Sequence, residues 1–488
     1  MQTLPIKLYS AQQAREIDRL AQEKMLVSGF ELMTKAAEAS FQAIKKYYPQ
    51  AKKIIVFCGA GNNAGDGYLI AKIALLAGYS VQLFSVVDEA RLKGDAALAK
   101  QAYVATGGSI LQEELSLLNN DADLLIDALL GTGLDRKVTG KFLIAIQAIN
   151  SFKIPVLSVD IPSGLNADTG NIMGTAVYAD MTISFIVLKR GLFTGLAADY
   201  CGKLLFSDLD ISNVVINHEV NLESLIAPIK LDKRLRSAHK GNFGHALVVG
   251  GDYGYAGAIQ LAAEAALNSG AGLVSVATRQ VHASQMYLSS AELMVHKLEL
   301  ITDIEDLLAK ITVLVLGPGL AQREWAKEIW PALINVEVPR VIDADALNLL
   351  AESPYYSEQW VLTPHPGEAA RLLQCSTADI LQDRYQAVRE LQKKYGGVCI
   401  LKGAGSLICA GQHVYVNSTG NPGMATGGMG DVLSGMIGAL LAQKYSPLEA
   451  AKIGVYLHGL AADKAALKIG ERGLRASDIL KFIREVVN

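Results

Sequence analysis

A glycine-dense stretch near the C-terminus carries the clearest chemistry in this sequence. The letters "NSTGNPGMATGGMGDVLSGMIGALLAQ" span residues 417–443, and the loop ends in "GMGD", at Asp431, before an apolar run. The free amides of such a loop and of a helix N-terminus favour an anion, such as a phosphoryl group in transfer. Asp431 at its mouth can accept a proton from an attacking hydroxyl. A packing role for the glycines would explain Gly435 and Gly438, but not an acid at the end of the loop.

Other short motifs of the C-terminal half follow expected strands. "CILKGAGSLI" places Lys402 and a glycine turn where they can cradle phosphates, and "LTPHPGE" holds His365 between two prolines. "VIDADALN" offers Asp343 and Asp345, which suit either a magnesium shell or ordinary helix capping. A lone histidine is usually structural, but this loop is unusually constrained.

The N-terminal half contains a second glycine-rich turn. "IIVFCGAGNNAGDGYLIAKI", residues 54–73, predicts a strand, a turn over 58–67 and a helix that starts near Tyr68. Glycines allow a sharp turn and a close backbone approach to a phosphate at the helix start. A turn without ligand is the alternative, but Asn62, Asn63 and Asp66 add hydrogen-bonding groups that a bare turn would not need. The spacing differs from G-x-G-x-x-G.

Two further loops of this half point to the same edge. Asp127 ends the strand-like "LLIDA" before a glycine-rich loop over 131–137, and Asp160 ends "VLSVD" before a Pro-Ser-Gly turn. Lys189 follows one more strand. Ligands lie outside the carboxyl ends of parallel strands, so these groups are expected to share a crevice. Each aspartate alone is often a cap or turn former, and a lone lysine is usually solvated.

The elements that must position these residues alternate between β-branched runs and helical stretches. Ser10 and Gln13 have capping-box spacing before the first helical stretch. The expected strands are 54–57, 81–86, 124–128, 156–159 and 181–185, then 245–250, 272–278, 313–317, 340–342, 360–363 and 398–401. This pattern predicts an α/β protein with two tandem doubly wound domains. The irregular stretch 208–240 contains the junction, which gives domains over 1–215 and 225–488 with a linker over 216–224.

Composition narrows the function further. The 488 residues are 51% hydrophobic and 19% charged, with a formal net charge of -3, which excludes a disordered or coiled-coil chain. Without a basic run, nucleic acid is not an expected partner. The five cysteines are scattered and show no metal-site spacing, and neither a secretory signal nor a membrane helix is expected. We therefore expect a cytoplasmic protein that acts on small molecules.

Three N-terminal motifs carry a resemblance. "CGAGNNAGDG", "DALLGTGL" and "DIPSGLNADTG" resemble the NAD(P)HX epimerase domain over about residues 5–215. The resemblance implies that hydrated nicotinamide nucleotide is bound by Asn62, Asn63, Ala64, Gly65, Asp66, Gly131, Thr132, Gly133, Leu134, Asp135, Arg136, Lys137 and Asp160. It also implies a potassium ion held by Asn63, Asp127 and Ser163, since oxygen ligands suit a hard cation. Ala64 stands where the family usually has Gly, and the N-terminal helix motif departs at Thr34.

Epimerisation inverts carbon 6 of the hydrated ring, so a positioned acid–base pair is needed. Asp160 is the first candidate, and Lys189 is the second because it matches the lysine that follows the last strand in the family. The sequence does not say which group moves which proton.

The C-terminal half resembles the ADP-dependent NAD(P)HX dehydratases, which have a ribokinase-like fold, over about residues 225–488. The motifs are "HKGNFGHALVVGGD", "LGPGL", "DADALN", "LTPHPGEAARLL", "LKGAG" and "GNPGMATGGMGDVLSG". The resemblance implies substrate contacts from Ala258, Gly319, His365 and Asp431, and an ADP site made by Lys402, Gly403, Ala404, Gly405, Ser406 and Gly430. It further implies a homo-oligomer, and Asp343 and Asp345, as possible magnesium ligands, lead us to expect magnesium in this domain. Asp252 replaces a usual Ser, and Ala321 replaces a usual Gly.

The sequence therefore predicts two consecutive activities. The first domain would interconvert R- and S-NAD(P)HX, and the second would dehydrate the S form while ADP becomes AMP and phosphate, with Asp431 as the base. The alternative is an ATP-dependent vitamin or sugar kinase fused to a non-catalytic N-terminal binding module. "LTPHPGE" together with "GNPGMATGGMGD" favours the dehydratase.

Overall fold

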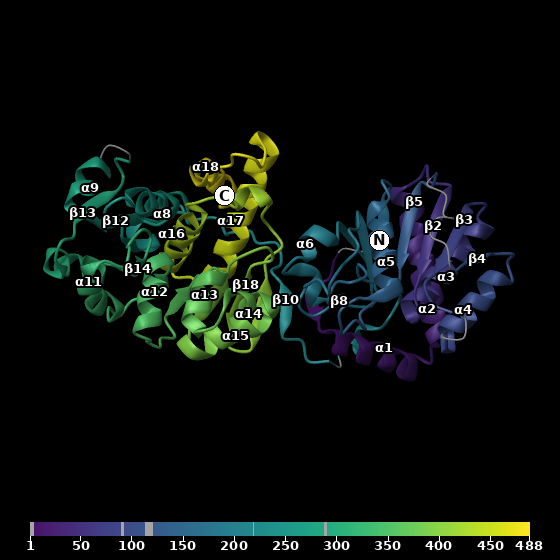
Figure 1. Ribbon diagram of the computed structural model, residues 1–488. Helices are drawn as coiled ribbons and strands as arrows, with labels where there is room; N and C mark the ends of the chain where they lie inside the picture. Colours follow the sequence, from purple (N-terminus) through teal and green to yellow (C-terminus); the bar gives the residue numbers. More distant parts are fainter. Residues whose placement is uncertain (1–3, 89–91, 113–120, 218, 287–289) are drawn as a thin grey trace. The chain divides into compact units, whose positions relative to one another are not determined.

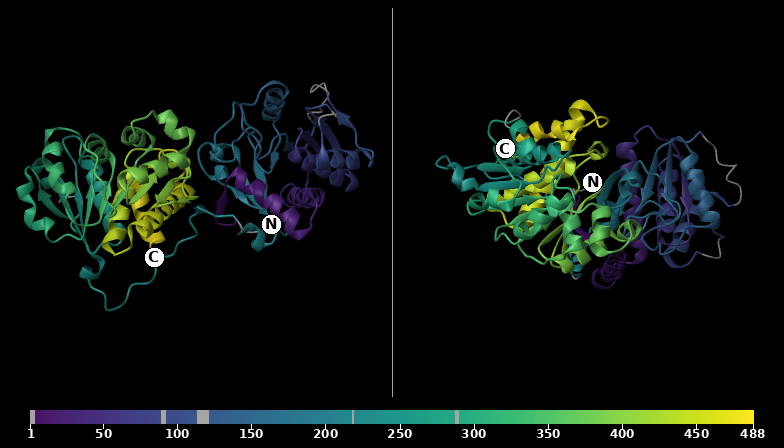
Figure 2. Two further views of the ribbon diagram at one scale, coloured as in Figure 1. Left: turned by 90° about the horizontal axis from the view of Figure 1, so that it is seen from below. Right: turned by 60° about the vertical axis from the view of Figure 1, so that its left-hand side comes forward.

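The computed structural model describes residues 4–88, 92–112, 121–217, 219–286 and 290–488. The chain divides into two compact units, Met1–Ser224 and Leu225–Asn488 (Figures 1 and 2). Within the described ranges, no helix combines the length and the apolar character that crossing a membrane requires.

Unit 1 is built on a seven-stranded parallel sheet with the order β4-β3-β2-β5-β6-β7-β9. Its strands are β2 (Lys53–Cys58), β3 (Ser80–Ser85), β4 (Ile110–Leu111), β5 (Leu124–Ala128), β6 (Val156–Val159), β7 (Met181–Phe185) and β9 (Lys203–Ser207). The chain runs outward from β2 to β4 and then returns to β5 on the other side of β2. This reversal is the topological switch of a doubly wound, Rossmann-like sheet, so the expected fold class is confirmed.

Helices cover both faces of this sheet (Figure 1). They are α1 (Ala11–Met25), α2 (Gly29–Tyr47), α3 (Asn62–Leu76), α4 (Gly94–Val104), α5 (Gly140–Ser151), α6 (Ala197–Tyr200) and α7 (Asn213–Ile216). Ile54 and Val56 pack on the side of α2 and α3, whereas Ile55 and Phe57 pack on the side of α5. Burial on both faces explains why these strands appear in the sequence as continuous apolar runs.

A small group of strands completes unit 1. β1 (Lys7–Tyr9) pairs parallel with β8 (Leu188–Lys189) and antiparallel with β10 (Glu223–Leu225). Helix α1 follows at once, and its capping box between Ser10 and Gln13 confirms the sequence prediction. The group thereby brings the start of α1 and Lys189 into the same region.

The predicted start of the helix after β2 was wrong. Helix α3 begins at Asn62, not near Tyr68, so the second half of the "turn" is helical. Gly65 and Gly67, which the sequence analysis assigned to the turn, lie within the helix and allow it to pack closely on its neighbours. A Cβ on Gly65 would lie 2.3 Å from Met33 Sδ, and one on Gly67 would lie 2.7 Å from Cys58 Sγ. These positions let α3 lie close to α2 and to β2.

Unit 2 contains a sheet with the order β13-β12-β11-β14-β15-β16-β17-β18-β19. Its strands are β11 (His245–Val249), β12 (Leu273–Thr278), β13 (Met294–Lys297), β14 (Val313–Leu316), β15 (Arg340–Ile342), β16 (Trp360–Leu362), β17 (Val398–Leu401), β18 (Leu407–Ala410) and β19 (His413–Val416). Pairing is parallel from β13 through β17 and antiparallel from β17 to β19. The second α/β domain is therefore confirmed as well.

Helices again cover both faces, as the views in Figures 1 and 2 show. They are α8 (Ala256–Asn268), α9 (Gln280–Met286), α10 (Glu305–Leu308), α11 (Glu324–Ile334), α12 (Ala344–Glu352), α13 (Pro366–Leu373), α14 (Thr377–Gln382), α15 (Arg384–Tyr395), α16 (Met429–Ala442), α17 (Pro447–Ile469) and α18 (Ala476–Val486). Helix α16 lies against α8, where a Cβ on Gly435 would come within 2.0 Å of the Ala262 carbonyl oxygen. Gly435 therefore has the packing role that the sequence suggested. This packing role does not explain why an acid, Asp431, stands at the start of the same helix.

Candidate active sites

A cavity of about 480 Å³ opens at the carboxyl edge of the unit 1 sheet. Residues from α1, α2, the start of α3 and the loops after β5 and β6 line it. The expected site residues among them are Asn62, Asn63, Asp66, Gly131, Thr132, Gly133, Leu134, Asp135, Arg136, Asp160 and Lys189. Three loops that are far apart in the sequence thus meet at one crevice, as the strand-end argument predicted.

Other expected residues lie away from this cavity. Ala64 and Gly65 are buried inside the packing of α3, and Lys137 is exposed beyond the lining residues. Asp127 and Ser163 are fully buried and do not line the cavity.

Asp160 and Lys189 form an ion pair between Asp160 Oδ1 and Lys189 Nζ. The lysine side chain is 4% exposed and the aspartate 15%. Lys189 Nζ also donates to Ser184 Oγ at 3.1 Å and to the Phe185 carbonyl at 3.2 Å. Asp160 has a φ of 68°, a left-handed conformation that is uncommon outside glycine, and its Oδ2 accepts from Thr132 Oγ1 at 3.2 Å. The orientation of this carboxylate therefore depends on an unusual backbone conformation and on the ion pair with Lys189.

Two further acids face the same cavity. Asp66 is buried, and desolvation raises the pKa of its carboxyl well above the usual range, with the nearby charges of Asp160 and Asp18 adding to the shift. Burial also raises the pKa of Asp18, on α1, to about 6. Sequence reasoning missed Asp18 altogether. It could have been found, because Asp18 lies four residues after Ala14 and three before Ala21, so it shares the buried face of α1.

Asp127 lies behind this cavity in a closed hydrogen-bond network. Its Oδ2 accepts from Ser158 Oγ and from the Ser163 amide, both at 2.8 Å, and its Oδ1 accepts from Ser163 Oγ at 2.5 Å. Burial raises the pKa of Asp127, and these hydrogen bonds oppose the rise. In the lining of the cavity, the buried amide of Asn63 has neither its oxygen nor its nitrogen paired within the described chain. An unpaired buried amide oxygen is the kind of ligand that suits a hard cation such as potassium.

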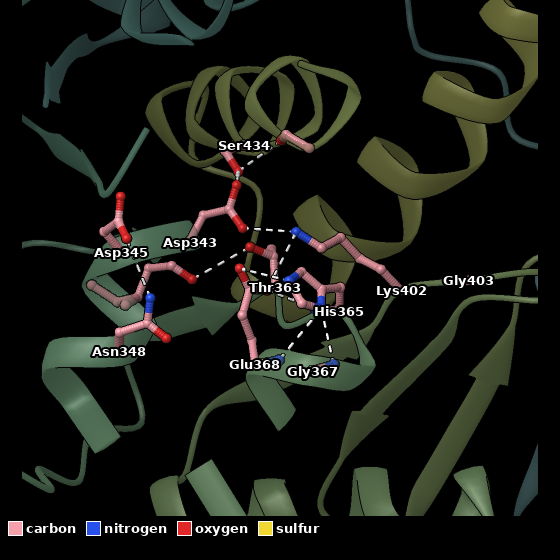
Figure 3. Close-up of polar contacts among 12 residues, drawn as sticks. Asp343, Asp345, Asn348, Thr363, His365, Gly367, Glu368, Lys402, Gly403 and Ser434 are labelled. Carbon is pink, nitrogen blue, oxygen red and sulfur yellow. Dashed lines mark hydrogen bonds and ion pairs between the residues drawn. The ribbon is translucent and has the colours of Figure 1, made fainter. Parts of the chain in front are cut away.

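The unit 2 site is organised around Lys402, the residue after β17 (Figure 3). Lys402 Nζ lies 2.9 Å from Asp343 Oδ1 and 3.8 Å from Glu368 Oε2. Asp343 Oδ2 accepts from Ser434 Oγ of α16 at 2.6 Å. Asp343 occupies the N-cap position of α12, but its side chain makes no capping bond, so the capping explanation of its carboxylate is wrong. The carboxylate instead joins the lysine to α16.

Asp431 lies in the first turn of α16, as expected for an acid at the mouth of an anion site. Burial raises its pKa to about 7; Asp343 adds to the rise and Lys402 opposes it. The same combination of burial and neighbouring charge raises the pKa of Glu368 to about 7. A Cβ on Gly430 would lie 3.2 Å from Lys402 Nζ, so glycine lets the start of the helix approach the lysine. A carboxylate that titrates near neutral pH is suited to act as a general base.

The carbonyl groups of the turn after β17 are bound by a residue that sequence reasoning did not single out. Arg384 is buried, and its guanidinium donates to the carbonyl of Ala404 at 2.5 Å and to those of Leu401 and Lys402 at 3.2 Å. The backbone of Gly403 and Ala404 remains exposed at the rim. Within the turn, the Gly403 amide donates to Ser406 Oγ at 3.2 Å, so the loop is held by its carbonyls and by its first amide.

The remaining expected residues lie at the starts of helices and in a loop: Ala258 in the first turn of α8, His365 at the N-cap of α13, and Gly319 after β14. A Cβ on Gly319 would lie 3.2 Å from Ala258 Cβ, so these two residues adjoin. The Gly319 carbonyl accepts from the Asp252 amide at 2.8 Å. The His365 side chain is 50% exposed and lies 3.4 Å from Glu368 Oε1. Asp345 holds the next loop, since its Oδ2 accepts from the Ala321 amide at 2.9 Å.

A second cavity, of about 1040 Å³, also lies in unit 2. Its lining includes Lys230, Arg234, Glu264 and Arg484, and none of the expected site residues. This cavity is therefore separate from the dehydratase-like residues.

Each unit is thus a doubly wound α/β domain with an acid–base site at the carboxyl edge of its sheet. A family model described as NAD(P)H-hydrate dehydratase matches residues 246–485, and one described as YjeF-related protein N-terminus matches residues 29–191. The bifunctional NAD(P)H-hydrate repair enzyme Nnr of Coxiella burnetii is 47% identical over 487 residues, which cover 99% of each chain. The corresponding Escherichia coli protein is 42% identical over 490 residues, which cover 100% of this chain and 95% of that one.

The chain belongs to the family of bifunctional NAD(P)H-hydrate repair enzymes. Among solved structures, a Bacillus subtilis ADP/ATP-dependent NAD(P)H-hydrate dehydratase co-crystallised with ATP and Mg²⁺ is 27% identical, with a TM-score of 0.48. The match covers 53% of this chain and 93% of that chain.

Proposed function

We propose that this chain repairs hydrated nicotinamide nucleotides in two consecutive reactions. Unit 1 interconverts R- and S-NAD(P)HX, and unit 2 dehydrates the S form while ADP is converted to AMP and phosphate. The observation that carries the proposal is the full-length similarity to bifunctional repair enzymes, together with a partly buried carboxylate at the start of α16.

In the dehydration, the hydroxide on carbon 6 is a poor leaving group and must be activated. We assign to Asp431 the removal of the hydroxyl proton while the oxygen attacks the terminal phosphorus of ADP and AMP leaves. The amides at the start of α16 lie where they can stabilise charge on the transferring phosphoryl group. The ring nitrogen then expels phosphate, and loss of a proton from carbon 5 completes the reduced nicotinamide. Ala258, Gly319 and His365 are proposed substrate contacts.

The proposed ADP site comprises Lys402, Gly403, Ala404, Gly405, Ser406 and Gly430. Its surroundings are acidic, since three carboxyl groups lie close enough to Lys402 to raise its pKa. They belong to Asp343, Glu368 and Asp431. A diphosphate approaching these carboxylates needs a cation, and Mg²⁺ typically binds through one or two carboxylates plus phosphate oxygens. Across the described residues, no group of three or more acidic, histidine or cysteine side chains could hold a metal by itself. We therefore propose that magnesium enters this site with the nucleotide.

In unit 1, we propose that the residues lining the 480 Å³ cavity bind hydrated nicotinamide nucleotide. Potassium would be held by Asn63, Asp127 and Ser163, and the unpaired Asn63 oxygen supports this assignment. A cation there would stabilise the charged form of Asp127, which burial alone disfavours. Ala64, Gly65 and Lys137, which the resemblance also implied, would act through the backbone or the rim of the site.

We also propose that the two activities reside in separable domains, 1–215 and 225–488. Each set of site residues lies within one of the two compact units, which supports this division. Expression of the two segments, followed by an assay of each, tests it.

The nearly neutral charge supports small molecules as the only partners besides further copies of the chain. Light scattering on the purified protein tests the proposed homo-oligomer. A nucleic-acid binding assay at low salt tests the exclusion of nucleic acid.

Nucleotide choice tests the proposed function as a whole. The protein is incubated with a mixture of R- and S-NADHX and with ADP or ATP, and the absorbance of reduced nicotinamide is followed. We expect complete recovery with ADP, with both epimers consumed. No recovery with either nucleotide would favour a small-molecule kinase fused to a binding module.

A further inference from the structure

Because Lys189 is held by hydrogen bonds, it is poorly suited to transfer protons, and the unit 1 site needs another group for that role. A lysine ammonium has three donors, and those of Lys189 point to Asp160, Ser184 and the Phe185 carbonyl. A proton leaving Lys189 would break this set and would leave the Asp160 carboxylate without its cation. Lys189 is therefore suited to orient the Asp160 carboxylate, and the second acid–base group is expected elsewhere in the cavity.

Asp18 lies in the required place. It projects from α1 into the lining of the cavity that also contains Asp160 and Lys189. Among the described residues, no hydrogen bond holds its carboxyl. Of these two carboxyl groups, Asp160 lies at the end of a sheet strand and is paired with a cation, whereas Asp18 lies on a helix and makes no such pair among the described residues.

Several elements that line the cavity place other charged groups around Asp18. Arg15 lies on α1, Asp66 on α3, Asp95 on α4, and Asp135 and Arg136 on the loop after β5. The pKa of Asp18 is raised mainly by burial. The charge of Lys189 lowers it, and the charge of Asp160 raises it further. The resulting value of about 6 keeps a protonated fraction of Asp18 available near neutral pH.

We propose that Asp18 is a catalytic residue of the epimerase and forms the acid–base pair with Asp160. The inference rests on the proposed epimerase function and deepens it, because it replaces Lys189 as the second proton-transfer group. Lys189 becomes a positioning residue, which acts through Asp160.

The pair accounts for inversion at carbon 6 with balanced proton transfers. Asp160 takes the proton of the carbon 6 hydroxyl, and Asp18 gives its proton to the ring nitrogen. The bond between the nitrogen and carbon 6 breaks with its electron pair going to the nitrogen, so that carbon 6 becomes an aldehyde. After rotation about the bond between carbons 5 and 6, the nitrogen attacks the other face of the aldehyde. Asp18 recovers the nitrogen proton and Asp160 returns its proton to the oxygen, so both groups end as they began.

The test compares full-length wild type, Asp18→Asn and Asp18→Glu, with R-NADHX as substrate and chromatographic separation of the two epimers. We expect Asp18→Asn to lose about 10²–10⁴-fold in kcat with little change in KM. In the wild type, kcat should fall as the pH rises through about 6, since Asp18 must be protonated. This limb should vanish in Asp18→Asn and return in Asp18→Glu.

The matched control is Glu23→Gln, which removes one carboxylate from the exposed face of the same helix. It should leave the rate and the pH profile unchanged. Wild-type kcat in Asp18→Asn, or a reduced kcat with an unmoved limb, would overturn the inference while leaving the epimerase function intact. A wild type that does not exceed the spontaneous rate of epimerisation would overturn the proposed function itself, and the inference with it.

Discussion

The two sites of this chain use similar components in opposite ways. Each places a lysine beside an aspartate at the carboxyl edge of a parallel sheet: Lys189 with Asp160 in unit 1, and Lys402 with Asp343 in unit 2. The Lys189 side chain is 4% exposed in the lining of a cavity, whereas that of Lys402 is 21% exposed. A buried ion pair suits proton transfer within one bound substrate, and a partly exposed lysine can be reached by an arriving nucleotide.

The acids around each lysine extend this contrast. In unit 2, Asp343 and Glu368 lie in direct reach of Lys402, and Asp431 follows at the start of α16. Their charges exceed that of the one lysine, which favours a magnesium nucleotide over a free one. In unit 1, the Asp160 carboxylate is neutralised within the protein by Lys189. We therefore expect the lysine–aspartate site of unit 2 to depend on magnesium that arrives with the nucleotide, whereas any cation in unit 1 would bind at the separate residues Asn63, Asp127 and Ser163.

Removal of the proposed base of unit 2 should have the largest effect. Asp431→Asn should lower dehydration by about 10²–10⁴-fold, because no carboxylate remains at the start of α16 to take the hydroxyl proton. Epimerisation by the same protein should remain normal, since that site lies in the other unit. Separate assays with S-NADHX plus ADP and with R-NADHX alone measure the two rates. Dehydration above about a tenth of the wild-type rate would reject Asp431 as the base.

A smaller loss is expected from the proposed potassium shell of unit 1. Asp127→Ala should slow epimerisation by roughly 10–100-fold, the range seen when groups around a metal are removed. Higher potassium concentrations should restore part of the rate. Dehydration should not respond, and Asp121→Ala, at an exposed aspartate, serves as the matched control. Identical potassium titrations for wild type and variant would argue against the whole shell.

The turn after β17 offers a test of nucleotide positioning. Arg384→Met should raise the KM for ADP by roughly tenfold, because the carbonyls of residues 401, 402 and 404 lose their donor, and the loss at the buried carbonyl of residue 401 costs about 1–3 kcal/mol. The KM for NADHX should change less. Lys393→Met, which removes an exposed cation from the same helix, is the control. An unchanged KM for ADP in Arg384→Met would place the nucleotide elsewhere.

The smallest effect concerns the pH dependence of unit 2. Dehydration should rise with pH through about 7, because Asp431 must lose its proton to act as a base. The negative charge of Glu368 helps to raise the pKa of Asp431, so Glu368→Gln should move this rise to lower pH. Rate profiles of both proteins with S-NADHX at saturating ADP measure the shift. A shift in the opposite direction would mean that Glu368 does not act on Asp431 by its charge.

The central strands could be predicted from the sequence because burial on both faces makes them continuous apolar runs. The short or half-buried strands escaped this argument: β4 has two partly buried residues, and β13 alternates irregularly. The start of α3 was misplaced because glycine reads as a turn residue even where, as at Gly65 and Gly67, it allows close packing.

Among the candidate site residues, sequence reasoning singled out those in strand-end motifs and missed two that lie within helices. Asp18 and Arg384 lie on helices, where a charged residue in a sequence is usually a surface residue. The spacing of Asp18 along α1 indicates its buried face, but only the fold shows that a cavity lies there and that Arg384 contacts the turn after β17.

Complementation between two full-length variants tests the central claim, that one chain carries two independent consecutive sites. Asp160→Asn protein with ADP and a mixture of R- and S-NADHX should form reduced nicotinamide until the S form is consumed, and then slow to the spontaneous rate. Addition of Asp431→Asn protein, which cannot itself dehydrate, should restart the reaction and consume the R form. Rapid consumption of both epimers by Asp160→Asn alone, or no restart on addition of Asp431→Asn, would contradict the account.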